Sequence, residues 1–283
     1  MFYNIVDKLR LLMNRNLSII YKMTGQATYT FEKPAIWMTL LLYQKIIYSH
    51  PFVIKYYQKY MDKLYAKKFV KEICGDKIHV ARLVRVLCDY NDVRHDDLNE
   101  NYMIKSNLNS GNNINIISTE KMTETDVKHK LELFNKRNVH TIQQQFFIEE
   151  KIECKYTGKS GNALTFIFRC IHGIPYTFTI RNKNIDQNTH YLIDSDCNLT
   201  LISMNYKDTN QIIYKNCIIP EKENIKKMYD LAGLLAKPFE FVRMDFYIEK
   251  NDDIYFSEYT FFPATGKKNF SIDIETMLGC KWT

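Results

Sequence analysis

The sequence lacks an apolar run long enough to cross a membrane as a helix, which takes about 18 residues or more. The closest candidate, residues 36–54, is interrupted by Gln44, Lys45, His50 and Pro51. No secretory signal pattern is visible either. The sequence therefore predicts a cytoplasmic protein.

Glycine, proline and paired cysteine are also scarce. With 9 Gly and 6 Pro among 283 residues, a loop-dominated or repetitive fold is excluded. The 7 Cys form no CxxC pair, which is typical of buried thiols in a reducing compartment. Neither a dinucleotide-binding nor a P-loop glycine motif occurs, and the 7 His show no Ser–His or Cys–His pattern.

What is abundant is aromatic and basic character. The 20 Tyr and 17 Phe predict a well-filled aromatic core. Residues 1–85 carry 15 Lys and Arg against 5 Asp and Glu, a net charge of +10, whereas the rest of the chain is net negative. This basic region is either a solvated helical surface or a contact for anionic lipid or acidic saccharide. No nucleic-acid partner is expected, because no such motif is present.

The periodicity changes along the chain. Residues 1–60 read as helical, and a further amphipathic helix is predicted over residues 62–73, ending near Gly75. Later helices are expected at 123–134, with a Thr123–Asp126 capping pattern, and at 224–235. Strands are expected at 82–88, 102–104, 146–148, 163–170, 175–180, 191–193, 241–248 and 254–261. The pattern predicts an α+β chain with largely antiparallel strands.

Two carboxylates stand within apolar strands that form one predicted hairpin. Asp245 lies in FVRMDFY and Glu258 in IYFSEYTFFPATG. Because neighbouring buried carboxylates repel, a divalent cation held by both would compensate their charge, and Mg²⁺ fits because it combines few carboxylates with phosphate oxygens and water. The alternative is a pair satisfied by Arg243 or Lys267.

Two other segments carry weaker signals of nucleotide binding. Lys105 ends a short strand and precedes a small polar loop containing Ser110 and Gly111, a combination suited to phosphate but also found in solvated lysines. The strand QQFFIEEKI ends in Glu149 and Glu150, which could reach ribose hydroxyls. Acidic pairs at strand ends are nevertheless common.

Taken in order, these segments resemble the ATP-grasp superfamily, and more closely its TupA-like family of teichuronopeptide biosynthesis. The similarity runs through TFEKPAIW, DKLYAKKFV, IKSNLNSGNN, FFIEE, FVRMDFY and SEYTFFPATG, from about residue 29 to the C-terminus. It implies an ATP-grasp fold, in which two α/β lobes with mainly antiparallel sheets clamp ATP. The implied division is a helical region at 1–60 and an ATP-grasp domain at 61–283. Within that domain, 61–148 form the N-terminal lobe and lid, and 149–283 form the C-terminal lobe with the metal site.

The resemblance also implies roles for individual residues. Phosphate-contacting lysines, a lid loop and a nucleotide hinge would be provided by Lys63, Lys67, Lys105, Ser110, Gly111, Glu149 and Glu150. Mg²⁺ would be held by Asp245 and Glu258. The transferred phosphate would be neutralised, or an acidic acceptor held, by the predicted catalytic residues Arg243, Arg169 and Arg181.

The activity implied is that of an ADP-forming carboxylate–amine ligase with an acyl-phosphate intermediate. Its substrate would be a uronic acid or an amino acid joined to a capsule or other surface polysaccharide, including a lipid-linked glycan at the inner face of the membrane. One departure is the segment Ala163-Leu164-Thr165, where relatives carry Asp-Tyr-Lys. It leaves open a degenerate nucleotide-binding accessory protein of glycan assembly. A metal-dependent glycosyltransferase is the third alternative.

Overall fold

The computed structural model describes residues 51–108, 113–116, 122–136, 144–158, 163–182, 187–202, 218–261, 263 and 270–282. The helices in these ranges are α4 (Pro51–Met61), α5 (Lys63–Cys74), α6 (Glu124–Lys136), α7 (Lys222–Ala236) and α8 (Ile272–Trp282). Short 3-10 turns occupy Gly75–Lys77, Tyr90–Asp92 and His95–Leu98. In this part of the chain, none of the helices is both long and apolar enough to traverse a bilayer.

The strands form two sheets. The larger has the order β1-β11-β10-β6-β7-β8-β9, and its neighbours are antiparallel except for β1 beside β11. Its strands are β1 (His79–Val80), β6 (Thr165–Ile171), β7 (Ile174–Asn182), β8 (Gln187–Ile193), β9 (Leu199–Ile202), β10 (Phe241–Ile248) and β11 (Ile254–Thr260). The smaller, antiparallel sheet has the order β2-β5-β3-β4. Its strands are β2 (Leu83–Leu87), β3 (Tyr102–Ser106), β4 (Asn113–Asn115) and β5 (Phe146–Glu150).

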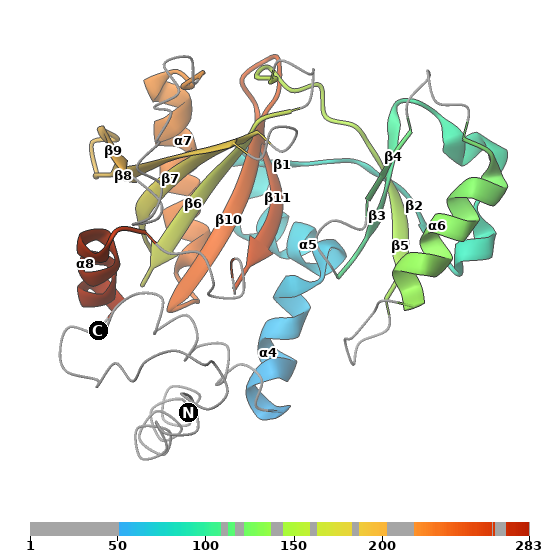
Figure 1. Cartoon of the computed structure of the whole chain (residues 1–283), viewed down its shortest axis with the longest axis horizontal. Helices are drawn as coiled ribbons and strands as arrows, with labels where there is room; N and C mark the ends of the chain where they lie inside the picture. The colour runs from blue at the N-terminus through green and yellow to red at the C-terminus, as the bar shows by residue number, and fades with distance from the viewer. Residues whose placement is uncertain are drawn as a thin grey trace.

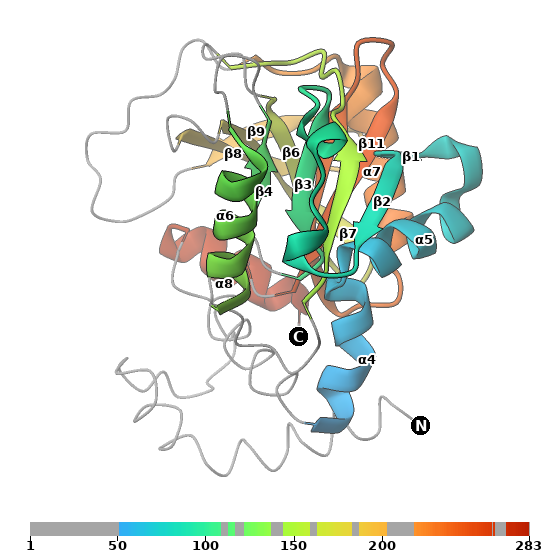
Figure 2. The same ribbon diagram turned by 90° about the vertical axis from the view of Figure 1, so that its right-hand side faces the viewer.

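The two sheets stand beside each other with α5 between them (Figure 1). Helix α6 covers the outer face of the smaller sheet, which stands in front of the larger sheet in Figure 2. That outer face is apolar: Ile104 and Ile148 pack with Val127 and Leu131 of α6. The opposite face of the smaller sheet is therefore directed toward α5 and the larger sheet.

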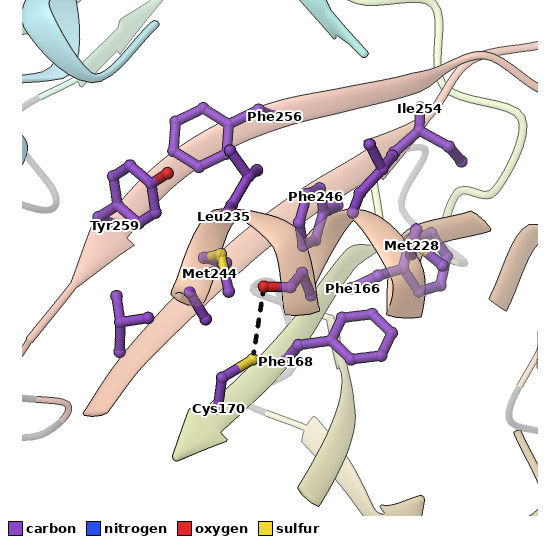
Figure 3. Packing of buried hydrophobic residues seen from close by; sticks show 14 of the residues in the cluster. Phe166, Phe168, Cys170, Met228, Leu235, Met244, Phe246, Ile254, Phe256 and Tyr259 are labelled. Carbon is purple, nitrogen blue, oxygen red and sulfur yellow. Dashed lines mark hydrogen bonds between the residues drawn. The ribbon is translucent and has the colours of Figure 1, made fainter. Parts of the chain in front are cut away.

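The larger sheet has one apolar and one polar face. Phe166 and Phe168 of β6 and Met244 and Phe246 of β10 are fully buried against α7 (Figure 3). Cys170 belongs to the same layer and its Sγ lies 3.9 Å from the Ala232 carbonyl oxygen. The intervening residues of these strands point to the other face. Alternation along each strand therefore presents the charged residues on one side of the sheet.

Helix α5 begins and ends where the sequence predicts. The Asp62 side chain accepts hydrogen bonds from the backbone N–H groups of Leu64 and Tyr65, which caps the first turn. Gly75 follows the last turn with a φ of 57°, a conformation that glycine adopts without steric cost. The helix is thereby fixed in register, and this positions the lysines along it.

The β10–β11 hairpin contains a β-bulge beside its carboxylates. Asp245 lies opposite Glu258, but Phe246 lies opposite Phe256, so that Ser257 is the extra residue of β11. Phe256 and Tyr259 can then both face the aromatic core although they are three residues apart. Glu258 remains on the polar face with Asp245.

Most predicted elements are confirmed, including the antiparallel hairpins and the Thr123–Asp126 capping box. The turn at His172-Gly173 has positive φ at both residues. Strands β1, β4 and β9 and helix α8 were not predicted. The predicted lobe boundary at 148/149 falls inside β5. Residues 51–60 of the predicted helical N-terminal region belong to α4, and residues 1–50 lie outside the described residues.

Candidate active site

The first half of the site is a buried carboxylate between two lysines. Glu149 of β5 forms ion pairs with Lys67 of α5 and Lys105 of β3, one at each carboxylate oxygen. The Lys67 ammonium also lies 5.2 Å from the centre of the Phe147 ring. We refer to Lys63, Lys67, Lys105 and Glu149 as the lysine cluster.

The fold explains why these groups meet. Lys105 and Glu149 lie on strands that pair directly, and neither points to the α6 face occupied by Ile104 and Ile148. Lys67 follows Lys63 by about one helical turn, so both lysines lie on the same side of α5. Glu149 therefore links the smaller sheet to a helix that packs on the larger one.

Lys63 differs because its nearest polar contacts are carbonyl groups. Its Nζ donates to the Ser106 carbonyl oxygen at 3.0 Å, with the Leu108 carbonyl oxygen at 3.5 Å. Burial is the largest influence on this ammonium and lowers its pKa to about 8, although Glu258 and Glu149 favour the charged form. Lys63 is thus placed where an added anion would stabilise its charge.

The pKa values of Lys105 and Glu149 move in opposite directions. Burial alone would lower the pKa of Lys105, but Glu149 outweighs it and the pKa rises. Burial alone would raise the pKa of Glu149, but Lys105 and Lys67 outweigh it and the pKa falls. Both groups are therefore charged at neutral pH.

The second half of the site is a group of arginines around Asp245, which is 1% exposed. Arg243 binds both oxygens of Asp245 through its Nε and Nη2 atoms, at 2.7 and 2.8 Å. Arg181 of β7 donates from Nη2 to Oδ2 of the same carboxylate at 2.7 Å. We refer to Arg169, Arg181, Arg243 and Asp245 as the arginine cluster.

Glu258, the other predicted metal ligand, is held more loosely. Its Oε1 lies 3.3 Å from Nη2 of Arg243, and its side chain is 18% exposed. It also influences the charges of Lys63 and Lys105, which places it between the two clusters. Glu258 is thus the carboxylate with the greater freedom to take a new ligand.

Arg169 lies opposite Arg243 across β6 and β10. Its Nη1 donates to the Thr179 hydroxyl at 2.8 Å and lies 3.4 Å from that of Thr177, and its Cζ lies 5.5 Å from the Phe270 ring centre. Burial and then repulsion from Arg243 lower its pKa to about 9, which Asp245 only partly opposes. Arg169 is the arginine of this cluster without a direct carboxylate contact among the described residues.

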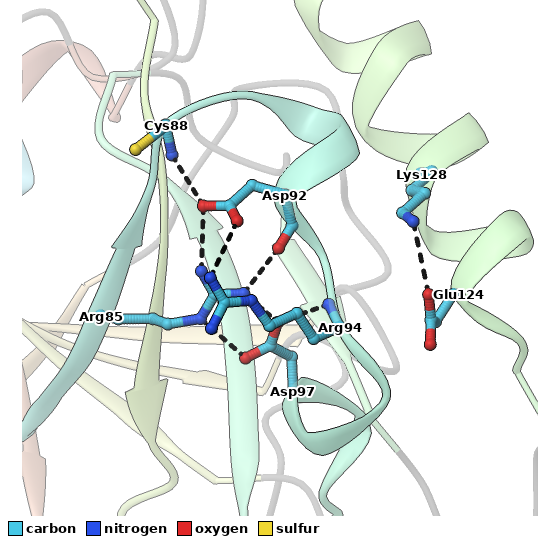
Figure 4. Close-up of polar contacts among 7 residues, drawn as sticks. All are labelled: Arg85, Cys88, Asp92, Arg94, Asp97, Glu124 and Lys128. Carbon is cyan, nitrogen blue, oxygen red and sulfur yellow. Dashed lines mark hydrogen bonds and ion pairs between the residues drawn. The ribbon is translucent and has the colours of Figure 1, made fainter.

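A different arginine shows what a structural ion pair looks like in this chain. Arg85 of β2 donates from Nε to Asp97 and from Nη1 to Asp92, both at 3.0 Å, and from Nη2 to the Asp92 carbonyl at 2.7 Å (Figure 4). These bonds fasten the turns after β2 to the smaller sheet. Arg94 lies at the rim of this network, 3.5 Å from Asp92.

The structure thus brings together nine of the predicted site residues, which are Lys63, Lys67, Lys105, Glu149, Asp245, Glu258, Arg243, Arg181 and Arg169. Glu150 lies apart from them, because it follows Glu149 in the strand and pairs with Arg82 at the surface. Ser110 and Gly111 lie outside the described residues. Lys105 lies inside β3, and its side chain is only 14% exposed and pairs with Glu149, so the solvated strand-end alternative is wrong.

The polar residues beside Arg169 were not predicted from the sequence. The hydroxyls of Thr177 and Thr179 of β7 accept hydrogen bonds from Nη1 of Arg169, and Nδ1 of His190 in β8 lies 2.8 Å from the Thr179 hydroxyl. The signal was present in the alternation of TFTIRN, which places Thr177, Thr179 and Arg181 on one face of the strand.

A family profile described as TupA-like ATPgrasp matches residues 45–282. The chain belongs to this family. The two-sheet architecture is accordingly an ATP-grasp fold, and the site lies where its two sheets meet. The comparison with curated proteins gave no match.

Similar solved structures include biotin carboxylase from Campylobacter jejuni, with 13% identity, 71% of this chain and 40% of that chain covered, and a TM-score of 0.45. D-alanine-D-alanine ligase from Coxiella burnetii shows 14% identity, coverages of 71% and 47%, and a TM-score of 0.41. N5-carboxyaminoimidazole synthase from Aspergillus clavatus shows 14% identity, coverages of 72% and 44%, and a TM-score of 0.42. This ATP-grasp chain thus spans less than half of the length of each of these three proteins, and its assignment rests on the family profile.

The carboxylates of this ATP-grasp site suit a magnesium ion. Asp245 and Glu258 provide hard oxygen ligands from directly opposed positions of one hairpin. Within the described residues, no group of three or more His, Cys, Asp and Glu is arranged to hold a metal. Two carboxylates fit Mg²⁺, which fills its other positions with water and phosphate oxygens.

Proposed function

We propose that this protein is an ATP-dependent carboxylate–amine ligase. The observation that carries the proposal is the placement of Glu258 between the lysine cluster and the arginine cluster. Lysines on one side and paired carboxylates on the other are the groups needed to hold a triphosphate and its cation. Family membership supports the same assignment.

The lysine cluster would bind the phosphates of ATP. Lys67 and Lys105 pair with Glu149, and Lys63 donates to the carbonyl oxygens of Ser106 and Leu108. Phosphate oxygens would add an anionic partner for Lys63 and would compete with Glu149 for the other two ammoniums. Glu149 would then be released toward the nucleotide.

Asp245 and Glu258 would hold Mg²⁺, which when bound supplies charge neutralisation for the phosphates. Arg243 fixes the orientation of Asp245 through two parallel hydrogen bonds, so this ligand needs little rearrangement. Arg243 also contacts Glu258 and so lies beside the position of the transferred phosphate. Positioning and charge stabilisation would then account for most of the rate enhancement.

The reaction has two steps. A carboxylate oxygen of the substrate attacks the γ-phosphorus of ATP, the bond to the β,γ-bridging oxygen breaks, and ADP leaves from an acyl phosphate. The nitrogen of an amine then attacks the acyl carbon, phosphate leaves with the bonding electrons, and the nitrogen loses a proton to give an amide. No nucleophilic side chain of the protein is required.

We further propose that the substrate is a uronic acid or an amino acid that becomes part of a surface polysaccharide. This part rests on the resemblance of the chain to teichuronopeptide-biosynthesis proteins and on the surplus of cations in the arginine cluster. The cluster sets three guanidinium groups against Asp245 and the weakly held Glu258, and of these only Arg181 and Arg243 form ion pairs with the carboxylates among the described residues. An acidic substrate would balance this charge.

Calorimetry of ATP binding tests the nucleotide and metal assignments. We expect tight binding with Mg²⁺ and weak binding in EDTA, because Mg²⁺ would link the phosphates to Asp245 and Glu258. Glu258→Gln should remove the increase in ATP affinity that Mg²⁺ provides. The control Glu223→Gln, on α7 at the opposite face of the larger sheet, should retain that increase. Equal affinity in Mg²⁺ and in EDTA would exclude the metal site.

Release of ADP and phosphate, measured with pairs of uronic acids and amines, tests the reaction. We expect both products in equal amounts and only when both substrates are present. Binding of Mg-ATP without turnover for any pair would instead favour an accessory nucleotide-binding protein, the alternative raised by Ala163-Leu164-Thr165.

A further inference from the structure

The polar face formed by β6 and β7 contains hydrogen-bond donors that no residue of the described chain satisfies. The Nε atoms of Arg169 and Arg181 and the hydroxyl oxygen of Thr165 are buried and have no hydrogen-bond partner there. Thr165 lies opposite Arg181 across the two strands, and Arg169 lies opposite Thr177. All three groups are on the face that carries Asp245, which lies opposite Ile167 of the same β6 strand.

The unsatisfied atom of Arg169 belongs to a two-pronged donor. In Arg243, the Nε and Nη2 atoms together grip both oxygens of Asp245. Among the described residues, Nε of Arg169 has no acceptor and Nη2 has no hydrogen bond, while Nη1 donates to the Thr177 and Thr179 hydroxyls. The edge of the guanidinium that binds a carboxylate in a bidentate manner is therefore unused.

Arg85 is a partly buried arginine with a structural role, and all of its guanidinium nitrogens have hydrogen-bond acceptors. Its three guanidinium nitrogens all donate to Asp92 or Asp97. Burying a cation without such a partner is unfavourable, and burying a donor without an acceptor adds to the cost. The neighbours of Arg169 hold it in place without neutralising it: two hydroxyls and the Phe270 ring.

We infer that Arg169 binds an anionic group of the acceptor substrate through its Nε and Nη2 atoms, with Nε of Arg181 and the Thr165 hydroxyl completing the site. The ligand is a carboxylate or phosphate group of the molecule that the ligase modifies. This inference rests on the proposed function and refines it. Arg181 is chiefly a positioning residue for Asp245, whereas Arg169 is the residue that contacts the acceptor.

The first test compares melting temperatures of the nucleotide-free variants Arg169→Met and Arg181→Met. Because Arg169 is an uncompensated cation, Arg169→Met should leave the melting temperature unchanged or raise it. Arg181→Met should lower it, because a hydrogen bond to buried Asp245 is lost. A fall for Arg169→Met as large as that for Arg181→Met would overturn the inference, since Arg169 would then be a structural residue.

The second test measures the stabilisation of the Mg-ADP-bound protein by inorganic phosphate, acetate, D-glucuronate and L-glutamate. We expect at least one anion to raise the melting temperature, and its apparent affinity to fall about tenfold or more in Arg169→Gln. The matched surface exchange Arg94→Gln should behave as wild type. If no anion stabilises the protein, or Arg169→Gln responds as wild type, the inference is wrong.

Calorimetry with Mg-ATP on the same variants separates this inference from the proposed function. We expect Arg169→Gln to bind Mg-ATP as wild type does. Failure of the wild type to bind Mg-ATP would count against the ligase assignment. Normal Mg-ATP binding with no Arg169-dependent anion effect would count against the acceptor site alone. Phosphate and the three carboxylates are tested separately, so the anion that stabilises the protein shows whether the site binds a phosphate or a carboxylate group.

Discussion

The lysine cluster and the arginine cluster lie next to each other, and each contains three cations and one buried carboxylate. The two clusters differ in the elements that carry them. The arginine cluster lies on strands of one sheet, with Asp245 gripped by the planar guanidinium of Arg243. The lysine cluster joins α5 to β3 and β5 of the other sheet, and its ammoniums meet Glu149 as point charges. The geometry of the arginine cluster is set by the pairing of strands within one sheet. The geometry of the lysine cluster depends on how α5 packs against the smaller sheet.

The difference indicates a division of labour. Guanidinium forks specify the direction of a carboxylate, as needed for a metal ligand or an anchored substrate. Ammonium groups on flexible stems can exchange one anion for another without a change of geometry. With the proposed function, Glu149 would be a temporary counter-ion for the lysines and Asp245 a permanent one for the arginines.

Asp245→Asn should have the largest effect. Loss of its charge leaves Arg243 and Arg181 without their buried partner, and the free energy of unfolding should fall by about 3–5 kcal/mol. Glu258→Gln, which removes a single 3.3 Å contact, should cost less than about 1 kcal/mol. Urea unfolding of both variants, with Glu223→Gln as control, measures this. Similar losses for the two would remove the distinction between a fixed and a loosely held ligand.

Glu149→Gln should also destabilise the nucleotide-free protein, by about 3 kcal/mol, because two buried ammoniums lose their counter-ion. Saturating Mg-ATP should remove most of this loss, because phosphates would replace the carboxylate. The loss caused by Asp245→Asn should remain. Unfolding curves with and without Mg-ATP provide the comparison. If nucleotide fails to restore Glu149→Gln, Glu149 is as permanent a partner as Asp245.

Lys63 predicts a pH dependence. Its pKa is about 8 in the folded protein against a usual value of 10.5, so the unfolded state binds more protons between these values. The free energy of unfolding of the wild type should therefore rise by about 2–3 kcal/mol relative to that of Lys63→Met as the pH rises from 8 to 10. Urea unfolding at pH 7.5, which is about half a unit below the folded pKa, and at about pH 10 checks this. If the difference in unfolding free energy between the two proteins stays constant with pH, burial does not lower the pKa of Lys63.

Lys105→Ala should weaken Mg-ATP binding by about 1.5–3 kcal/mol, the usual loss for one charge-assisted contact. Lys128→Ala is the matched control, because Lys128 pairs with Glu124 on α6 and lies on the other side of the smaller sheet (Figure 4). Calorimetry measures both affinities. Equal affinities would mean that Lys105 serves only to neutralise Glu149.

Much of the fold could be predicted because its signals are local. Asp62 and Gly75 bound α5 through a side-chain cap and a left-handed residue, and both are visible in the sequence. Strands β1, β4 and β9 have two to four residues, too few for an alternating pattern to be recognised. Helix α8 lacks a clear polar stripe in its sequence, IDIETMLGCKW.

The site was predictable in membership but not in pairing. Asp245 and Glu258 share a hairpin, so their proximity follows from the sequence. The contact of Glu149 with Lys67 joins residues 82 positions apart and depends on how α5 packs against two sheets. No local pattern encodes such a contact. The same holds for the unused edge of Arg169, which becomes visible only when the bonds of every neighbouring group are known.

The extra residue of β11 has a consequence for changes in chain length. Ser257 reverses the inward–outward alternation between Phe256 and Glu258, so that one half of the strand is out of phase with the other. A substitution at Ser257 keeps that reversal, because the number of backbone units is unchanged. Deletion of Ser257 would instead restore a regular ladder in which Phe256 and Glu258 are adjacent, so that Phe256 stays in the aromatic layer and Glu258 stays on the polar face. Position 257 should therefore tolerate many side chains and also its own deletion, which would remove the bulge and leave the two faces of the hairpin as they are.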